Sequence, residues 1–164
     1  MSVFVDTSAL YALMVATEKA HPETEAAFRE LLQAGRNLIT SNYVLLECSA
    51  VLQRRFGLGS VRDLASRLIP ILEVRWIDQG IHRRSVERLL RTDRRGLSLV
   101  VCSSFVLMEE EGIRDALALD EDFAEQGFRV LPSRRPGGAR VSEGGARRGY
   151  STRPWRNQRR RARS

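Results

Sequence analysis

Two aspartates, Asp6 and Asp120, each follow a short apolar run that is typical of a buried strand. In parallel α/β sheets, ligands bind beyond the carboxyl ends of the strands, where residues that follow different strands converge. Asp6 also has a structural alternative, because Thr7 and Ser8 come next and an Asp before a helix often caps it. Either aspartate alone therefore fits a helix cap as well as a functional site.

Glu47 is a sharper candidate. It lies three residues after Val44 and four before Val51, on the face that a helix must bury. An ionised carboxylate seldom lies there without a positive partner or a metal. The alternatives are a place at the edge of the apolar stripe, or a pairing with an Arg. We favour a functional role for this side chain.

Further acids follow the predicted strand at residues 114–119 and the apolar stretch at 97–108. Asp120 begins the cluster Asp120-Glu121-Asp122, and we expect it to point to the site. Asp122 is expected either to join the site or to cap the following helical turn. Residues 109–111 are three glutamates at the end of a helix, where the dipole does not favour negative charge, so we interpret them as a solvated surface.

These separated carboxylates have no Lys or His beside them in the sequence, a pattern that suits a hard cation such as Mg²⁺ or Mn²⁺. Such metals serve phosphodiester hydrolysis, because they make hydroxide from water and stabilise the leaving oxygen. They also reverse the local negative charge, which would otherwise repel a phosphate backbone. The residues therefore point to a metal-dependent nuclease.

The elements that must position these acids alternate between strands and helices. The sequence predicts strands at residues 3–5, 38–40, 73–77, 114–119 and 128–131. It predicts helices at residues 8–15, from Pro22 to Gly35, at 43–56, at 61–72 and at 81–91, and a further apolar stretch at 97–108. Ser60 with Asp63 resembles a capping box for the helix at 61–72, and Pro70 is expected to kink or shorten its last turn. The alternation predicts an α/β fold with a mainly parallel central sheet of about five strands, covered on both faces.

Charge divides the chain into two parts. Residues 133–164 carry eleven Arg and one acid, a net charge of +10, which leaves −3 for residues 1–132 within the total of +7. The first part has the size of one domain with a single core. The second is rich in Gly, Arg and Ser and has almost no aliphatic residues, so we expect a disordered basic tail. The tail is either an extension without function or an aid to RNA binding, with Tyr150 and Trp155 stacking on bases.

The remaining composition indicates a protein of the cytoplasm. No apolar stretch is both long enough and uncharged enough to cross a bilayer, and the start, MSVFVDTS, lacks a basic region before its apolar residues. Cys48 and Cys102 lie in apolar segments without metal-ligand spacing. We expect two buried thiols.

Three segments resemble the PIN-domain ribonucleases, and most closely the VapC-type toxins of bacterial toxin–antitoxin pairs. They are FVDTSALYAL, TSNYVLLECSAVLQRRFG, and LSLVVCSSFVLMEEEGIRDALALDEDFAEQGFRVLP, within residues 2–132. The resemblance implies a three-layer α/β/α PIN-like nuclease domain over residues 1–132, with metal-dependent endoribonuclease activity. It implies an RNA substrate, a homodimer, and a small cognate antitoxin that inserts into the acidic groove.

The same resemblance implies roles for individual residues. Asp6, Glu47 and Asp120 align with the family's metal-binding acids, and Asp122 is a helper. Thr7 and Ser8 are expected to hydrogen-bond the ligand shell.

One position departs from the family pattern. Where the family usually has an Asp at the start of the last long helix, this chain has Val101. A valine can neither ligate a metal nor accept a proton, so we expect weaker metal affinity and impaired cleavage. The alternative function is a catalytically inactive PIN-fold module that binds antitoxin or RNA.

Two other hydrolase classes fit less well. A phosphatase of the haloacid-dehalogenase type needs a second Asp two residues after Asp6, where this chain has Ser8, and a Lys near the phosphate; the only lysine is Lys19. A serine hydrolase is disfavoured because no GxSxG motif occurs.

Basic residues near the predicted site are candidates for phosphate contacts, although their usual meaning is a solvated face. These are Arg54, Arg55, Arg83, Arg84, Arg94 and Arg95. His21 and His82 are interpreted as ordinary surface residues.

Overall fold

The computed structural model describes residues 1–92 and 96–133. In chain order, its first half contains β1 (Ser2–Val5), α1 (Thr7–Met14), α2 (His21–Gln33), β2 (Asn37–Ser41), α3 (Asn42–Phe56) and α4 (Leu58–Asp63). A π-helical turn (Leu64–Leu68) and a 3₁₀ turn (Ile69–Ile71) lead to β3 (Glu73–Arg75). The second half contains α5 (Gln79–Thr92), α6 (Leu99–Glu110), β4 (Asp115–Leu117), α7 (Asp122–Glu125) and β5 (Arg129–Leu131).

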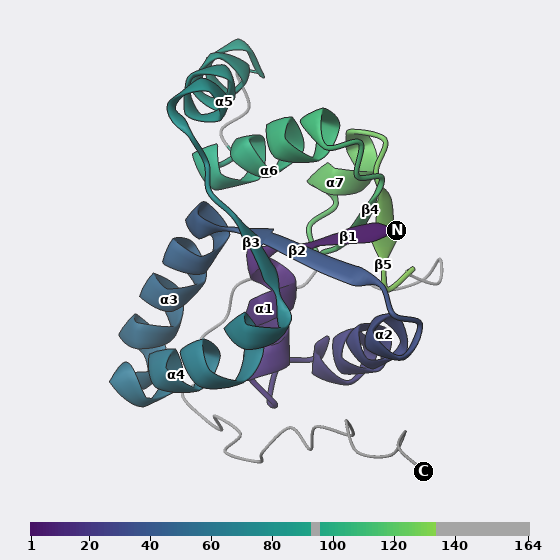
Figure 1. Ribbon diagram of the computed structural model, residues 1–164. Coiled ribbons are helices and arrows are strands. Elements are labelled where there is room, and N and C mark those ends of the chain that lie inside the picture. Colours follow the sequence, from purple (N-terminus) through teal and green to yellow (C-terminus); the bar gives the residue numbers. More distant parts are fainter. Residues whose placement is uncertain (93–95, 134–164) are drawn as a thin grey trace.

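The five strands form one parallel sheet in the order β3-β2-β1-β4-β5. Figure 1 shows α1 to α4 on one face of this sheet and α6 and α7 on the other, with α5 farther out beyond α6. The α/β fold with three α/β/α layers and a parallel five-stranded sheet is therefore confirmed. Because all strands run the same way, the segments that follow them meet at one edge, which we call the carboxyl edge.

The central strand β1 is apolar because helices cover both of its faces. Val3, Phe4 and Val5 are fully buried. On the α6 side, the ring of Phe123 lies 6.4 Å from that of Phe4 and 5.0 Å from that of Phe105, measured between centroids. This packing holds α6 and α7 against the strands that end at the candidate site.

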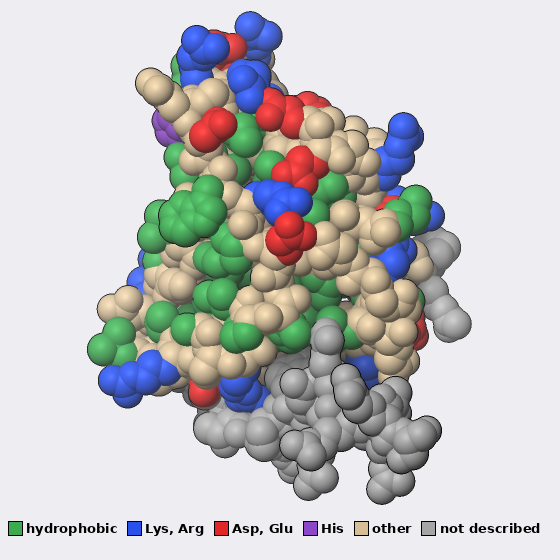
Figure 2. Space-filling model, viewed as in Figure 1, with side chains coloured by type: hydrophobic (Ala, Val, Ile, Leu, Met, Phe, Trp, Pro, Cys, Tyr) green, Lys and Arg blue, Asp and Glu red, His purple; other side chains and the backbone are tan. Residues whose placement is uncertain are grey.

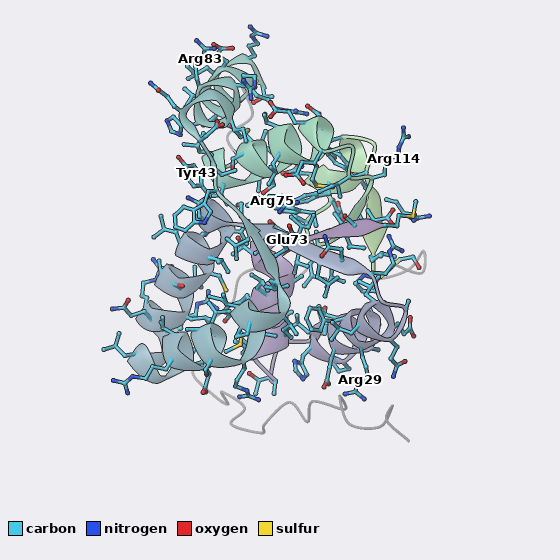
Figure 3. The ribbon with its side chains drawn as sticks, in the orientation of Figure 1. Arg29, Tyr43, Glu73, Arg75, Arg83 and Arg114 are labelled. Carbon is cyan, nitrogen blue, oxygen red and sulfur yellow. The ribbon has the colours of Figure 1, made fainter. Side chains whose placement is uncertain are left out.

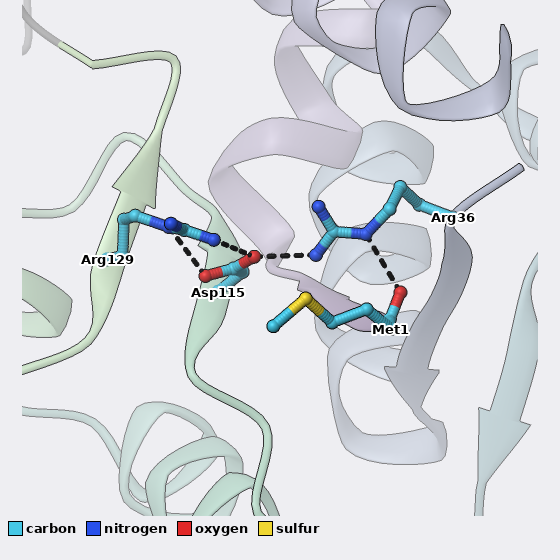
Figure 4. Close-up of polar contacts among 4 residues, drawn as sticks. All are labelled: Met1, Arg36, Asp115 and Arg129. Carbon is cyan, nitrogen blue, oxygen red and sulfur yellow. Dashed lines mark hydrogen bonds and ion pairs between the residues drawn. The ribbon is translucent and has the colours of Figure 1, made fainter. Parts of the chain in front are cut away.

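The carboxyl edge lies opposite a buried ion-pair cluster at the amino-terminal ends of the strands (Figure 4). Asp115, 2% exposed, accepts hydrogen bonds from Arg36 at 2.6 Å and from Arg129 at 2.7 and 2.5 Å. Arg36 also donates to the carbonyl oxygen of Met1 at 2.9 Å. This cluster joins the starts of β1, β2, β4 and β5.

The segment between α3 and β3 differs from expectation. The capping box of Ser60 and Asp63 was wrong: α4 begins at Leu58, directly after Gly57, whose φ is +79°. The Ser60 hydroxyl lies inside the helix and donates to the Gly57 carbonyl at 2.7 Å. In place of the expected single helix over residues 61–72, the structure has α4, the wider π-helical turn and the tighter 3₁₀ turn. Pro70 lies in the 3₁₀ turn, which agrees with the expected shortening of the helix at this proline.

The other elements follow the predicted order, with strands β3 and β4 shorter than expected. The two cysteines are free and buried, as predicted. No helix in the described ranges is both long and apolar enough to cross a membrane. Apart from Ser133, the tail predicted for residues 133–164 lies outside the described residues, as do Arg94 and Arg95.

Candidate metal centre

Asp6 lies at the end of β1 and caps α1, so both roles considered for it are present. One carboxylate oxygen, Oδ2, accepts a hydrogen bond from the backbone N–H of Ser8 at 3.0 Å and another from its hydroxyl at 2.6 Å. The side chain is buried, with 3% of the residue exposed. Its other oxygen, Oδ1, is also buried and has no hydrogen-bond partner among the described residues.

The surroundings of Asp6 disfavour its negative charge. Burial raises the pKa of the Asp6 carboxyl, the hydrogen bonds from Ser8 and Thr7 lower it in part, and the nearby charge of Glu47 raises it further. A buried oxygen without a donor normally requires an explanation, such as an ion. A cation between the two acids would satisfy this oxygen and remove the repulsion between them.

Glu47 reaches the same place from α3. The Thr7 hydroxyl donates to its Oε2 at 2.6 Å, which ties α3 to the start of α1. Glu47 is half-buried, and no Arg or Lys among residues 1–92 and 96–133 forms an ion pair with it. The expected contacts of Thr7 and Ser8 with these acids are present.

The neighbouring thiol does not compete for a cation. Burial, followed by the charges of Asp6 and Glu47, raises the pKa of Cys48 to about 12. A thiol with this pKa remains protonated near neutral pH and is a poor metal ligand. The available donors at this end of the sheet are therefore carboxylate oxygens.

Asp120 lies at the same carboxyl edge, after β4. The Ser8 hydroxyl accepts a hydrogen bond from Leu119 N–H at 3.0 Å, so the residue before Asp120 is tied to the start of α1. Asp120 Oδ1 accepts from Asp122 N–H at 3.0 Å and thereby opens α7. Asp122 lies in the first turn of α7. Burial raises the pKa of the Cys102 thiol on α6, the charge of Arg88 lowers it in part, and the charge of Asp122 raises it.

The structure brings Asp6 and Glu47 together but does not bring a third acid into the same group. In the parts of the chain that the structure describes, no three His, Cys, Asp or Glu side chains form a group that could hold a metal ion. That Asp120 and Asp122 join the pair stays a prediction. The chemistry of the pair still fits a hard divalent cation, since it offers two carboxylates and a buried oxygen, and no described residue gives this oxygen a partner or places a cationic side chain against the pair.

Val101 lies at the third position of α6, whose first turn Ser98 caps by accepting a hydrogen bond from Val101 N–H at 3.1 Å. Val101 is buried at 8% exposure and belongs to the hydrophobic core. The first turn of α6 therefore carries an apolar side chain at a place where the positive end of the helix dipole would stabilise a carboxylate.

The acidic run at the end of α6 is neutralised by arginines. Glu109 pairs with Arg88, Glu110 with Arg84, and Glu111 with Arg75, which also pairs with Glu73. Figure 2 shows these acids and arginines side by side over α5, α6 and β3, and Figure 3 labels Arg75 next to Glu73. This run is a surface, as expected, and Arg84 is engaged there and not with the candidate centre.

Both histidines have specific partners, so their interpretation as ordinary surface residues was wrong. His21 Nδ1 lies 2.7 Å from the Ala12 carbonyl oxygen, and His82 Nδ1 lies 2.8 Å from the Tyr43 hydroxyl. Both residues are half-buried. A single sequence gives no signal for such contacts between elements.

Comparisons with known proteins agree with this architecture. A family model described as PIN domain matches residues 3–129. The 23S rRNA-specific endonuclease VapC20 of Mycobacterium tuberculosis, from two strains, is 34% identical over 127 residues. The match covers 77% of this chain and 95% of that protein.

Two solved structures are similar to the chain. The crystal structure of M. tuberculosis VapC20, described as a Sarcin-Ricin loop cleaving toxin, has a TM-score of 0.68 and 34% identity, covering 77% of this chain and 96% of that one. VapBC2 from Rickettsia felis, bound to a DNA fragment from their promoter, has a TM-score of 0.57 and 14% identity, covering 79% of this chain and 97% of that one. The second likeness shows the fold alone.

Proposed function

Because the chain belongs to the PIN-domain family, we propose that it is a VapC-type endoribonuclease toxin that hydrolyses RNA phosphodiester bonds with a divalent metal. The observation that carries the proposal is the paired Asp6 and Glu47 at the carboxyl edge, with a buried Asp6 oxygen that lacks a partner among the described residues. The 34% identity to a 23S rRNA endonuclease over nearly all of that protein supports the same function.

In this proposal, Asp6 and Glu47 hold the metal, and Asp120 and Asp122 complete its surroundings. Ser8 and Thr7 orient the two ligands through hydrogen bonds of 2.6 Å each. When bound, the metal, Mg²⁺ or Mn²⁺, would supply a hydroxide from water and stabilise the charge of the leaving oxygen.

Val101 bears on how active this chain is. A PIN fold that binds RNA or an antitoxin without cutting is the alternative function, and the buried apolar side chain at the start of α6 favours it. The retained Asp6 and Glu47 favour an enzyme, because two neighbouring carboxylates and a buried oxygen without a partner among the described residues suit a divalent metal.

We further propose that the partners are those of a toxin–antitoxin pair: a cognate antitoxin protein, a second copy of the chain, and an RNA substrate in the cytoplasm. Since the similar VapC20 is named for 23S rRNA, ribosomal RNA is the first substrate to test.

The test is RNA cleavage by the purified full chain with Mn²⁺, with Mn²⁺ plus EDTA, and by Asp6→Asn as a control for contaminating nuclease. We expect fragments of ribosomal RNA only in the first reaction. Equal cleavage in all three would assign the activity to a contaminant. No cleavage and no binding of RNA would overturn the proposed function, whereas binding without cleavage would establish the inactive module.

A further inference from the structure

We propose that Tyr11 and Arg55 form a binding site for the RNA backbone. This site lies two turns along α3 from Glu47 of the Asp6–Glu47 pair. This inference rests on the proposed function and names residues that position the substrate without touching the reacting atoms. It concerns the side of the protein where α1 and α3 run next to each other away from the carboxyl edge (Figure 1).

Two contacts between α1 and α3 define this surface. At the carboxyl edge, the Thr7 hydroxyl donates to Glu47 at 2.6 Å. One turn later on α1 and two turns later on α3, Arg55 Nη1 donates to the Tyr11 hydroxyl at 2.8 Å. The acidic pair and the Tyr11–Arg55 pair are therefore successive contacts between the same two helices.

The spacing suits a nucleic acid strand. Eight residues of helix separate Glu47 from Arg55, a rise of about 12 Å at ~1.5 Å per residue. A stacked strand rises about 3.4 Å per nucleotide, so a phosphate at Arg55 would lie three to four nucleotides from one held at the metal. One strand could contact both places at once.

The charge of Arg55 is available for a ligand. Arg36, Arg75, Arg84, Arg88 and Arg129 each form an ion pair with a carboxylate. Arg55 is exposed and has no carboxylate partner among the described residues, where its polar contacts are with Tyr11. The charges of those five arginines are therefore compensated, whereas that of Arg55, two turns along α3 from Glu47, is not compensated by any described carboxylate.

Tyr11 holds the guanidinium in a defined orientation. The Arg55 guanidinium carbon lies 5.3 Å from the centre of the Tyr11 ring, within the range of a cation–π contact. The guanidinium donors that Tyr11 does not use can bind phosphate oxygens in the planar geometry that arginine favours. Arg55 also lies in the last turn of α3, where a positive charge is favourable for the helix dipole. That role alone would need neither the ring nor the hydroxyl of Tyr11.

The experiment measures RNA binding by the full chain in EDTA, so that cleavage does not interfere. The probe is a fluorescein-labelled single-stranded ribosomal RNA fragment, titrated by anisotropy at several salt concentrations. Arg55→Gln is compared with Arg114→Gln, which removes the same charge from an exposed arginine at the start of β4, on the opposite edge of the sheet (Figure 3). The basic tail is unchanged in both variants.

For Arg55→Gln we expect roughly three- to tenfold weaker binding and a salt slope that is smaller by about 0.7, the value for one phosphate contact on a single strand. Arg114→Gln should match the wild type. Tyr11→Phe keeps the ring but removes the hydroxyl, so it should weaken binding less than Arg55→Gln. Arg55→Lys should restore the slope but only part of the affinity.

An affinity and slope for Arg55→Gln equal to those of Arg114→Gln would overturn the inference and assign the pair to the packing of α1 on α3. Thermal melting identifies variants that bind poorly because they are unfolded. If the wild-type chain itself neither binds nor cleaves RNA, the proposed function fails instead, so the two failures are distinguishable.

Discussion

At the scale of single residues, the centre depends on a charge that the protein buries at a cost. Asp6 is 3% exposed, one of its oxygens lacks a partner among the described residues, and Glu47 adds a second negative charge nearby. Burying an ionised group without compensation is unfavourable, so the metal-free protein is less stable than it would be without the charge of Asp6. A bound cation would offset this cost.

The pKa of Asp6 gives this cost a pH dependence. Its pKa in the folded protein is raised, so the stability it contributes is fully present below the pKa of the unfolded chain and is lost as pH rises through the folded value. We predict that Asp6→Asn raises the Tm of the metal-free protein by several degrees at neutral pH. The gain should shrink below the ordinary pKa of an Asp. Melting curves in EDTA across pH check this, and an equal or lower Tm for Asp6→Asn at neutral pH would contradict it.

Glu47 is predicted to be a metal ligand. Glu47→Gln keeps the size and the hydrogen bond from Thr7 but removes the charge, so we expect Mn²⁺ affinity to fall roughly 10- to 100-fold, as for other changes that weaken a metal site. Isothermal titration calorimetry measures this. Glu30→Gln, on the exposed side of α2, is the matched control. Unchanged affinity in Glu47→Gln would remove Glu47 from the site.

Val101 occupies the position where the family resemblance implies an acid. We predict that Val101→Asp raises Mn²⁺-dependent RNA cleavage by roughly 10-fold or more, because a carboxylate there adds a ligand at the positive end of α6. The matched control is Val101→Asn, which changes the shape in the same way without adding charge. Cleavage at the wild-type level by well-folded Val101→Asp protein would refute the role of this position.

At the scale of elements, the two edges of the sheet carry opposite arrangements of charge. The carboxyl edge holds two acids without a cationic partner among the described residues, whereas the amino-terminal edge holds one acid between two arginines. The second arrangement is compensated and stabilises the sheet. The first is uncompensated and is left for a ligand.

The Asp115 cluster should be measurable in folding stability. Its hydrogen bonds with Arg129, and then with Arg36, hold the pKa of Asp115 below its ordinary value against the effect of burial. The stability it contributes is therefore present above the unfolded pKa and is lost as pH falls through the folded value. We predict that Asp115→Asn lowers the free energy of unfolding at neutral pH by about 2 kcal/mol.

Urea unfolding at neutral and acid pH checks this prediction. The control is Arg29→Gln, where the ion pair with Glu25 spans one helical turn on the exposed side of α2 and is worth about 0.5 kcal/mol or less. The difference in the free energy of unfolding between Asp115→Asn and the control variant should become smaller at acid pH. Equal losses at neutral pH would mean that the cluster adds nothing beyond a surface pair.

Local spacing explains which elements could be predicted. Strands β1 and β4 could be predicted because short apolar runs end at Asp6 and Asp120. Helix α3 could be predicted because Ser41 or Asn42 can cap its start and Gly57 can end it; in the structure the cap is Ser41. The start of α4 was missed because Gly57 turns the chain so sharply that the helix begins at once. No local pattern in the sequence indicates that turn.

At the scale of the whole molecule, contacts between distant segments are what the sequence could not provide. The family resemblance predicted that Glu47 and Asp6 belong to one site. No pattern in the sequence predicted the contacts of the Tyr11–Arg55 pair or of the Asp115 cluster, because their residues lie far apart in the chain. The sequence also could not predict the distance between Asp120 and the Asp6–Glu47 pair, because this distance depends on how α1, α3 and β4 pack together. These are the features that the fold adds to the residue pattern.

The division of charge also belongs to this scale. The sequence of residues 1–132 has a net charge of −3, so its attraction for RNA depends on local positive charge and on the metal. The tail has a net charge of +10, and whether it aids RNA binding stays a prediction.

The most direct measurement of the central claim is anomalous X-ray diffraction from crystals of the full chain grown with Mn²⁺. We predict a Mn²⁺ peak between the carboxylates of Asp6 and Glu47, with the Asp6 Oδ1 oxygen as a ligand and Asp120 on the side of the ion nearer β4. A peak elsewhere, or none at this place in crystals that hold Mn²⁺ at another site, would contradict the metal centre.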